Sequence, residues 1–239
     1  MRSSVLLPAL ALTAALLSAC TQEAVPSFSQ SLPSGTPDLT VGSASSFSQG
    51  SKAPLDLDLL TQSYVDVAAL PVLDVSVEER VQFDDRTLTL EDSIDNELEY
   101  LVYQLYYDQT AADFDSYTNL VGETKSLQIV TQNEAENFQD GLYMTEYTLH
   151  ALNTLTRDDL AQVSPYDKED LQNKQNTFHF TEYAIVEADV SWKYSESYLQ
   201  QGPQLEEGRY LRYYLLAKTP EVPEYKWYEL YWDDFLEPV

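Results

Sequence analysis

The chain has 239 residues, and its 13 Lys+Arg against 40 Asp+Glu give a formal net charge of −27. This charge argues against a nucleic-acid binder, because phosphate contacts need a basic surface, and the 44% hydrophobic content excludes a chain that is disordered throughout. The single Cys excludes a disulfide framework and a zinc site built from Cys ligands.

Residues 1–19 have the order of a secretory signal peptide. Arg2 supplies the positive start, residues 5–17 form an apolar run, and the small residues Ser18 and Ala19 follow. The apolar run is shorter than the roughly 20 residues that a membrane-spanning helix needs. We therefore expect export of the chain and removal of this segment.

The only cysteine stands at the predicted cleavage point. Leu17-Ser18-Ala19-Cys20 resembles the lipobox of bacterial lipoproteins, and the resemblance implies that Cys20 becomes the lipidated first residue of the mature protein. That family carries at least a diacylglyceryl group, and two acyl chains hold a protein stably on a bilayer. The alternative is an ordinary secretory signal with a chance Cys. We expect a lipid-anchored protein on the extracytoplasmic side of a cell membrane or outer membrane.

The next two segments differ in composition. Residues 20–55 are rich in Ser, Thr, Gly, Pro and Gln and almost free of charge, which predicts a flexible linker after the lipidated Cys. Residues 56–92 are interpreted as a lead-in segment that packs on the outside of the domain. Its end, residues 81–90, predicts a hairpin around the acidic turn Asp84-Asp85-Arg86.

Two helices and a short third one are expected in residues 93–164. The first begins after Asp92 or Ser93 and runs to about residue 113, with apolar residues spaced at three and four and with additional tyrosines. The second covers residues 124–140 and ends at Gly141 in the left-handed conformation. The third begins at Thr156 and is short because Pro165 follows.

Period-two alternation predicts four strands. They cover residues 143–151, 178–194, 209–218 and 225–232, and the last three follow one another as an antiparallel meander. The order of elements indicates an α+β domain, residues 93–239, in which helices pack on a curved antiparallel sheet.

This order resembles the nuclear-transport-factor-2-like fold, a cone that ketosteroid isomerases share with many small binding domains. The closing run Tyr225–Trp232 is similar to the last strand of such domains in bacterial lipoproteins, as are Tyr147–His150 and Leu155–Leu160. The resemblance covers roughly residues 93–236 and implies a pocket between the sheet and the helices.

Aromatic residues give the only indication of a ligand. All of the 18 Tyr except Tyr64 lie from Tyr100 onward. Ligand pockets favour aromatic walls, so one set of aromatic residues is a candidate pocket lining: Tyr147, Tyr183, Tyr213, Tyr214, Trp227 and Tyr231. The alternative, which we favour, is that these rings fill the core.

No known catalytic, phosphate-binding or metal-binding motif occurs in the sequence. A Ser-His-acid group assembles in space, so spacing does not exclude one, but only His150 and His179 are available and a structural role is the better interpretation of each. We predict no catalytic residue, no metal and no cofactor. The expected function is a non-catalytic domain that binds a small molecule or an envelope protein; the alternative is a small-molecule enzyme that uses the cone cavity.

Overall fold

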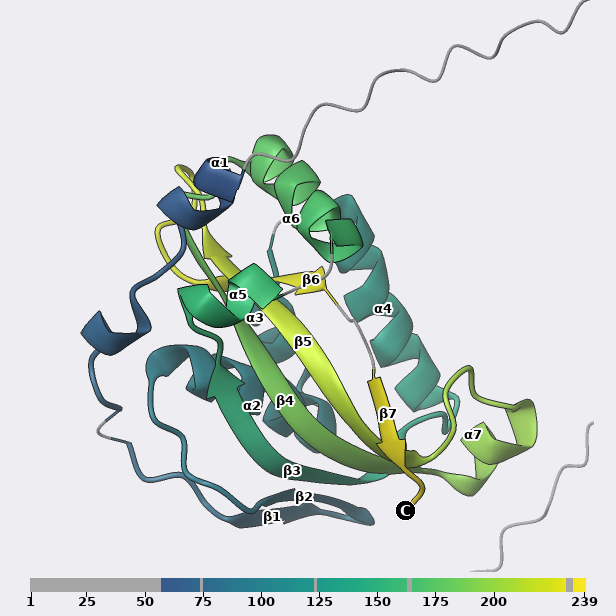
Figure 1. The fold of residues 1–239 in the computed structure, drawn as a ribbon. Coiled ribbons are helices and arrows are strands. Elements are labelled where there is room, and N and C mark those ends of the chain that lie inside the picture. The colour runs from purple at the N-terminus through teal and green to yellow at the C-terminus, as the bar shows by residue number, and fades with distance from the viewer. Residues whose placement is uncertain (1–56, 74, 123, 163–164, 231–233) are drawn as a thin grey trace, which may run out of the picture. The chain divides into compact units, whose positions relative to one another are not determined.

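The computed structural model describes residues 57–73, 75–122, 124–162, 165–230 and 234–239. They form an α+β arrangement of one open, mostly antiparallel sheet with helices on both of its faces (Figure 1). The coarse fold class predicted from the sequence is therefore confirmed. No helix among the described residues is both long enough and apolar enough to cross a membrane.

The helices are α1 (Leu57–Gln62), α2 (Glu97–Ala111), α3 (Phe114–Leu120), α4 (Lys125–Gln139), α5 (Arg157–Gln162), α6 (Pro165–Phe178) and α7 (Glu196–Gln201), with a 3-10 turn at Val67–Ala69. The strands are β1 (Arg80–Phe83), β2 (Arg86–Leu90), β3 (Met144–Thr154), β4 (Glu182–Tyr194), β5 (Gly208–Lys218), β6 (Lys226–Leu230) and β7 (Asp234–Glu237).

The sheet has the strand order β1-β2-β3-β4-β5-β6, and β7 pairs with the other half of β5. Only the β2–β3 pair is parallel among these pairings. The hairpin of β1 and β2 turns at Asp84 and Asp85, and the β4–β5–β6 meander is present, so both predictions are confirmed. The long central strand β4 is paired on both edges.

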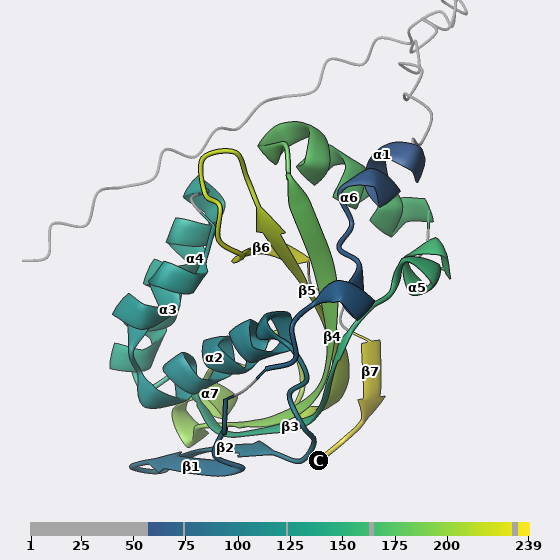
Figure 2. The ribbon, with the colours of Figure 1, turned by 90° about the vertical axis from the view of Figure 1, so that its left-hand side faces the viewer.

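Helix α2 packs on the concave face of the sheet, and α3 and α4 lie on the same side (Figure 2). Its residues Leu98, Val102 and Leu105 are fully or almost fully buried, as their helical spacing predicts. The helix begins at its N-cap Asn96 rather than at Asp92 or Ser93. The side chain of Asn96 accepts hydrogen bonds from two backbone N–H groups of the first turn, which leaves the preceding residues outside the helix.

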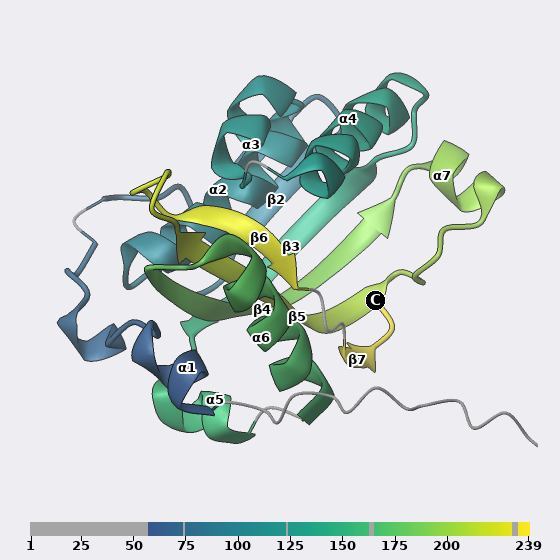
Figure 3. The same ribbon diagram turned by 90° about the horizontal axis from the view of Figure 1, so that it is seen from above.

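Helices α1, α5 and α6 lie on the opposite face of the sheet, over the end where β4 begins (Figure 3). They cover Tyr183 and Ile185 of β4. These two residues point to the outer face of the sheet, and they are nevertheless completely buried. The hydroxyl of Tyr183 donates to the carbonyl of Leu60, and the hydroxyl of Tyr64 donates to the carbonyl of Leu155 at 2.7 Å. Leu60 and Tyr64 thus belong to the core, and the folded unit includes α1 and the β1–β2 hairpin as well as residues 93–239.

The short helix expected after Thr156 is confirmed as α5, but around residue 165 a further helix is present that was not predicted, and one predicted strand boundary is wrong. Pro165 does not only follow a short helix; it begins α6, because its fixed φ and missing N–H suit a first helical position. The helix continues to Phe178, so strand β4 begins at Glu182 and not at residue 178. The sequence gives no apolar stripe here, since α6 is polar and buries little besides Leu171 and Gln175.

We expect Asn96→Ala to lower the free energy of unfolding by about 2–3 kcal/mol. The substitution removes the cap of α2 and also the amide donor to the buried Glu99 carboxylate (2.9 Å) and to the Thr154 hydroxyl (3.0 Å). Urea unfolding measures the change. Asp113→Ala, which removes the exposed cap of α3, is the matched control and costs about 1 kcal/mol or less; equal losses in the two variants would contradict the role of Asn96 in joining α2 to β3.

Candidate functional site

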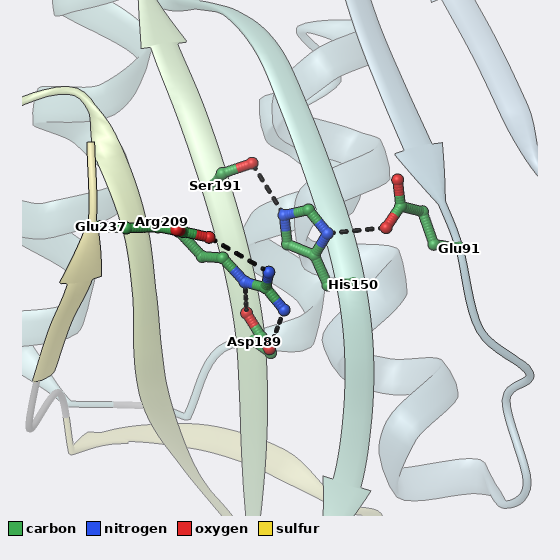
Figure 4. Close-up of polar contacts among 6 residues, drawn as sticks. All are labelled: Glu91, His150, Asp189, Ser191, Arg209 and Glu237. Atoms are coloured by element: carbon green, nitrogen blue, oxygen red, sulfur yellow. Dashed lines mark hydrogen bonds and ion pairs between the residues drawn. The ribbon is translucent and has the colours of Figure 1, made fainter. Parts of the chain in front are cut away.

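A polar cluster lies on the outer face of the sheet, across β3, β4 and β5 (Figure 4). Its six members come from five neighbouring segments of the sheet: Glu91, His150, Asp189, Ser191, Arg209 and Glu237. Strand alternation in β4 places Asp189 and Ser191 on this face, because Ala188 and Val190 are buried on the other. Glu91 follows β2 directly, where its backbone N–H still donates to Leu149.

His150 joins three strands of this face. Its Nδ1 lies 2.7 Å from Glu91 Oε2, and its Nε2 lies 3.0 Å from Ser191 Oγ. The β3–β4 register shifts between Leu149 and Ala151, so His150 is the extra residue of a bulge. Alternation after the buried Leu149 places His150 on the outer face, and the bulge puts the next residue, Ala151, on the same face opposite Asp189. The side chain of His150 remains 19% exposed.

Arg209 holds the second half of the cluster. Its guanidinium donates to both carboxylate oxygens of Asp189 at 2.6 Å, the planar two-bond geometry that suits a carboxylate. A weaker contact of 3.4 Å joins it to Glu237 of β7. Hydrogen bonding to Asp189 raises the pKa of Arg209, so the guanidinium stays charged and fixed between its neighbours.

The order carboxylate, imidazole, hydroxyl in Glu91, His150 and Ser191 is that of a nucleophilic triad. Acyl transfer also needs free N–H groups aimed at the developing oxyanion. Ser191 lies opposite Thr148 of β3 and Arg209 of β5, so the backbone around it is paired on both sides. The cluster therefore has the side chains for proton transfer in a hydrolytic site. The backbone N–H groups around Ser191, which would have to stabilise the oxyanion, are used in hydrogen bonds to the neighbouring strands.

The inner face of the sheet carries a second polar arrangement, made of tyrosine hydroxyls. Tyr106 of α2 and Tyr214 of β5 are joined through their hydroxyls at 2.6 Å. The Tyr147 hydroxyl donates to the side-chain oxygen Oε1 of Gln109 at 3.2 Å, and Nε2 of the same Gln109 side chain donates to the Tyr117 hydroxyl at 3.1 Å. Burial raises the pKa values of Tyr106, Tyr117 and Tyr147, which keeps their hydroxyls neutral.

Glu134 of α4 reaches this interior. It borders, with Tyr147 and Gln109, a cavity of about 20 Å³, which has room for one water molecule. Burial raises the pKa of Glu134, and the charge of Arg212 opposes that shift. No hydrogen bond joins this carboxylate to another residue in the described part of the chain. The inward position of Glu134 could have been predicted from the sequence, because Glu134 falls on the buried face of α4 that begins at Leu127.

The predicted pocket residues do not border a single space. Tyr147, Tyr214 and Trp227 lie on the inner side and pack around Tyr106 or against one another, with ring centroids 5.0–6.0 Å apart. Tyr183 and Tyr213 lie across the sheet from them, since each precedes an inward residue of its strand. Tyr231 and Cys20 lie outside the described residues. His179 is exposed at the end of α6.

Comparisons with known proteins found no matching family model, no matching curated protein and no matching solved structure. In the part of the chain that the structure describes, no three His, Cys, Asp or Glu residues are grouped so that they could hold a metal ion.

Glu134 predicts a measurable pH dependence of stability. Its pKa is raised in the folded state, so the charged form is disfavoured there, and the resulting loss of stability develops as the pH rises from the ordinary glutamate range. We expect Glu134→Gln to raise the melting temperature at about pH 7 more than at about pH 4. Glu136→Gln, on the exposed side of the same helix, is the control, and an equal pH dependence in both variants would show that burial of Glu134 is not the cause.

Proposed function

We propose that this chain is a bacterial lipoprotein, anchored through Cys20 on the extracytoplasmic side of a membrane, with a non-catalytic binding domain. The sequence around Cys20 carries the proposal: the single cysteine follows an apolar run and two small residues, at the position where the lipoprotein family is acylated. Residues 20–55 then form a linker between the anchor and the domain. The acidic residues that give the full chain its net charge of −27 lie mostly in that domain and disfavour its direct contact with anionic lipid.

We further infer that the domain is a nuclear-transport-factor-2-like cone. The curvature of the sheet around α2 supports this inference, as does the sequence of helices α2, α3 and α4 before the strands β3 to β6 (Figure 2). In such a cone a ligand would enter between the sheet and the helices. Here Tyr106, Tyr147 and Tyr214 fill that space with contacts between rings, which supports binding on an outer surface in place of catalysis in the interior.

The rigid polar cluster around His150 and Arg209 is the best surface for a protein partner. Its side chains are held in place before any partner arrives, so less conformational entropy is lost when they form new contacts. Charged residues at such a surface mainly determine which partner binds and how fast it associates. An envelope protein is the expected partner, and the surface is formed by the cluster residues of β3, β4, β5 and β7 together with Glu91.

Cys20→Ala tests the anchor. We expect the unmodified chain to incorporate a labelled fatty acid and to sediment with membranes, and the variant to lose both properties, because the thiol is the only acylation site of the proposal. Ser18→Ala, which keeps a small residue before the cleavage point, should behave like the unmodified chain. A Cys20→Ala chain that still sediments with membranes after removal of its signal peptide would overturn the proposal.

A serine hydrolase is the second candidate, and the distances of His150 to Ser191 and Glu91 favour it specifically. A fluorophosphonate probe distinguishes the two functions, because it labels only a serine that a base activates. The non-catalytic proposal predicts no labelling above that of heat-denatured protein. Labelling of the native chain that disappears in both Ser191→Ala and His150→Ala would establish the hydrolase instead.

A further inference from the structure

Strand β1 forms one edge of the sheet. It pairs with β2 alone among the described strands, and it lies outermost in two views of the molecule (Figures 1 and 2). The strands from β2 to β5 are paired on both sides. An unpaired edge leaves a row of backbone N–H and C=O groups with which a strand of another chain can pair. The sheet can therefore be extended at β1.

The register of the hairpin identifies the free backbone groups. Phe83 and Arg86 pair across the two-residue turn, so they exchange hydrogen bonds, and the bonding direction alternates from there along the strand. The Glu79 carbonyl has the same phase, because it accepts a hydrogen bond of 2.7 Å from the last N–H of β2. The N–H and C=O groups of Arg80 and Gln82 thus point away from β2, where no other described strand lies.

A groove of about 330 Å³ lies beside this edge, on the side of the sheet that α2 covers. Val81 lines it from β1 and no described residue of β2 does, so the groove is on the free side of the strand. Alternate side chains of an added strand would point toward α2 and into this space. The wall is mostly polar, and Glu78 is its only charged residue among those described.

Carboxylates lie at both ends of the free edge. Glu78, just before β1, is exposed, and the side chain of Asp84 in the turn is 90% exposed although it lies 3.3 Å from Arg86. Arg80 is the single cation of β1. A segment with basic residues at its ends would be attracted to these carboxylates. An acidic segment would be repelled, and so would a second copy of this chain, whose net charge is −27.

We propose that β1 binds an extended segment of another protein as an additional edge strand, and that this segment carries basic residues at both ends. Backbone hydrogen bonds to Arg80 and Gln82 hold the segment, while its alternate side chains enter the groove and select it. The acidic ends of the edge keep copies of this chain apart and still admit a basic partner. The proposal goes beyond the proposed function, and it depends neither on the lipid anchor nor on the cluster around His150.

A blocked seven-residue peptide tests the edge, with lysine at both ends and threonine and valine alternating between them. We expect saturable binding to the full chain carrying Cys20→Ala, and at least ten-fold weaker binding of the same peptide with glutamate at both ends. Amide hydrogen exchange locates the strand, because the peptide should protect the outward N–H groups of Arg80 and Gln82 more than those of Val81 and Phe83. No saturable binding, equal binding of the two peptides, or absence of this protection would each overturn the proposal.

Variants of the edge separate its backbone from its charges. Gln82→Pro removes an outward N–H that β2 does not use, so we expect at least ten-fold weaker peptide binding, and no loss in Gln82→Thr, which keeps the N–H. Glu78→Gln and Asp84→Asn should each weaken binding about two- to five-fold, and the exposed Glu136→Gln on α4 should leave it unchanged. Melting temperatures show that each variant is folded. Unchanged binding in a folded Gln82→Pro variant, or equal effects of the three charge substitutions, would contradict the assignment.

Sedimentation of the chain without peptide distinguishes the other occupant of the edge. We expect a monomer, because the net charge repels a second copy. A dimer that dissociates in the Gln82→Pro variant would assign the edge to a second copy of this chain and overturn the choice of a basic partner.

Discussion

The fold depends on the burial of β4 on both faces over its first half. Residues 183–186 of this strand are completely buried, although alternate side chains point to opposite sides of a sheet. One layer of helices covers one face only, so the chain needs α2 on the inside and α1, α5 and α6 on the outside (Figures 1 and 3). This explains why residues from Leu60 onward belong to the core, far in sequence from the strand that they cover.

The outer helices end where β4 changes from apolar to polar residues, and the rest of the outer face has to satisfy its polar groups along the sheet itself. His150 and Arg209 do this by bonding to side chains of adjacent strands. The same bonds hold Glu91, Asp189 and Ser191 in fixed positions at the surface. A structural requirement therefore produces the ordered polar surface on which we place the protein partner.

Local patterns predicted the α+β class, the hairpin, α4 with Gly141 at its end, and the meander, because periodicity and turn residues are properties of neighbouring positions. They did not predict the features that depend on contacts between distant segments. The parallel pairing of β2 with β3 and the bulge at His150 depend on residues far apart in the chain. Helix α6 was missed because its sequence is polar, and the helix forms with the help of packing on α1 and of Phe178 on Tyr228 of β6. That Tyr183 and Tyr213 lie on the opposite face of the sheet from Tyr147 follows from strand alternation, and it could have been predicted from the sequence.

The tyrosine-rich composition has two separate consequences, and helix α2 divides them. A rotation of about 100° per residue directs Tyr106 to the sheet and turns its neighbours Tyr103 and Tyr107 toward β1 and the segment before it. Inside, the rings meet one another and the hydroxyls pair, which closes the space that a cone would offer to a ligand. On the other side of the helix, Tyr107 packs against Phe83 of β1, and the Tyr103 hydroxyl donates to the Glu78 carbonyl at 3.5 Å. The same residue type thus fills the interior and joins α2 to the segment before β1, and the position around the helix decides which of the two each tyrosine does.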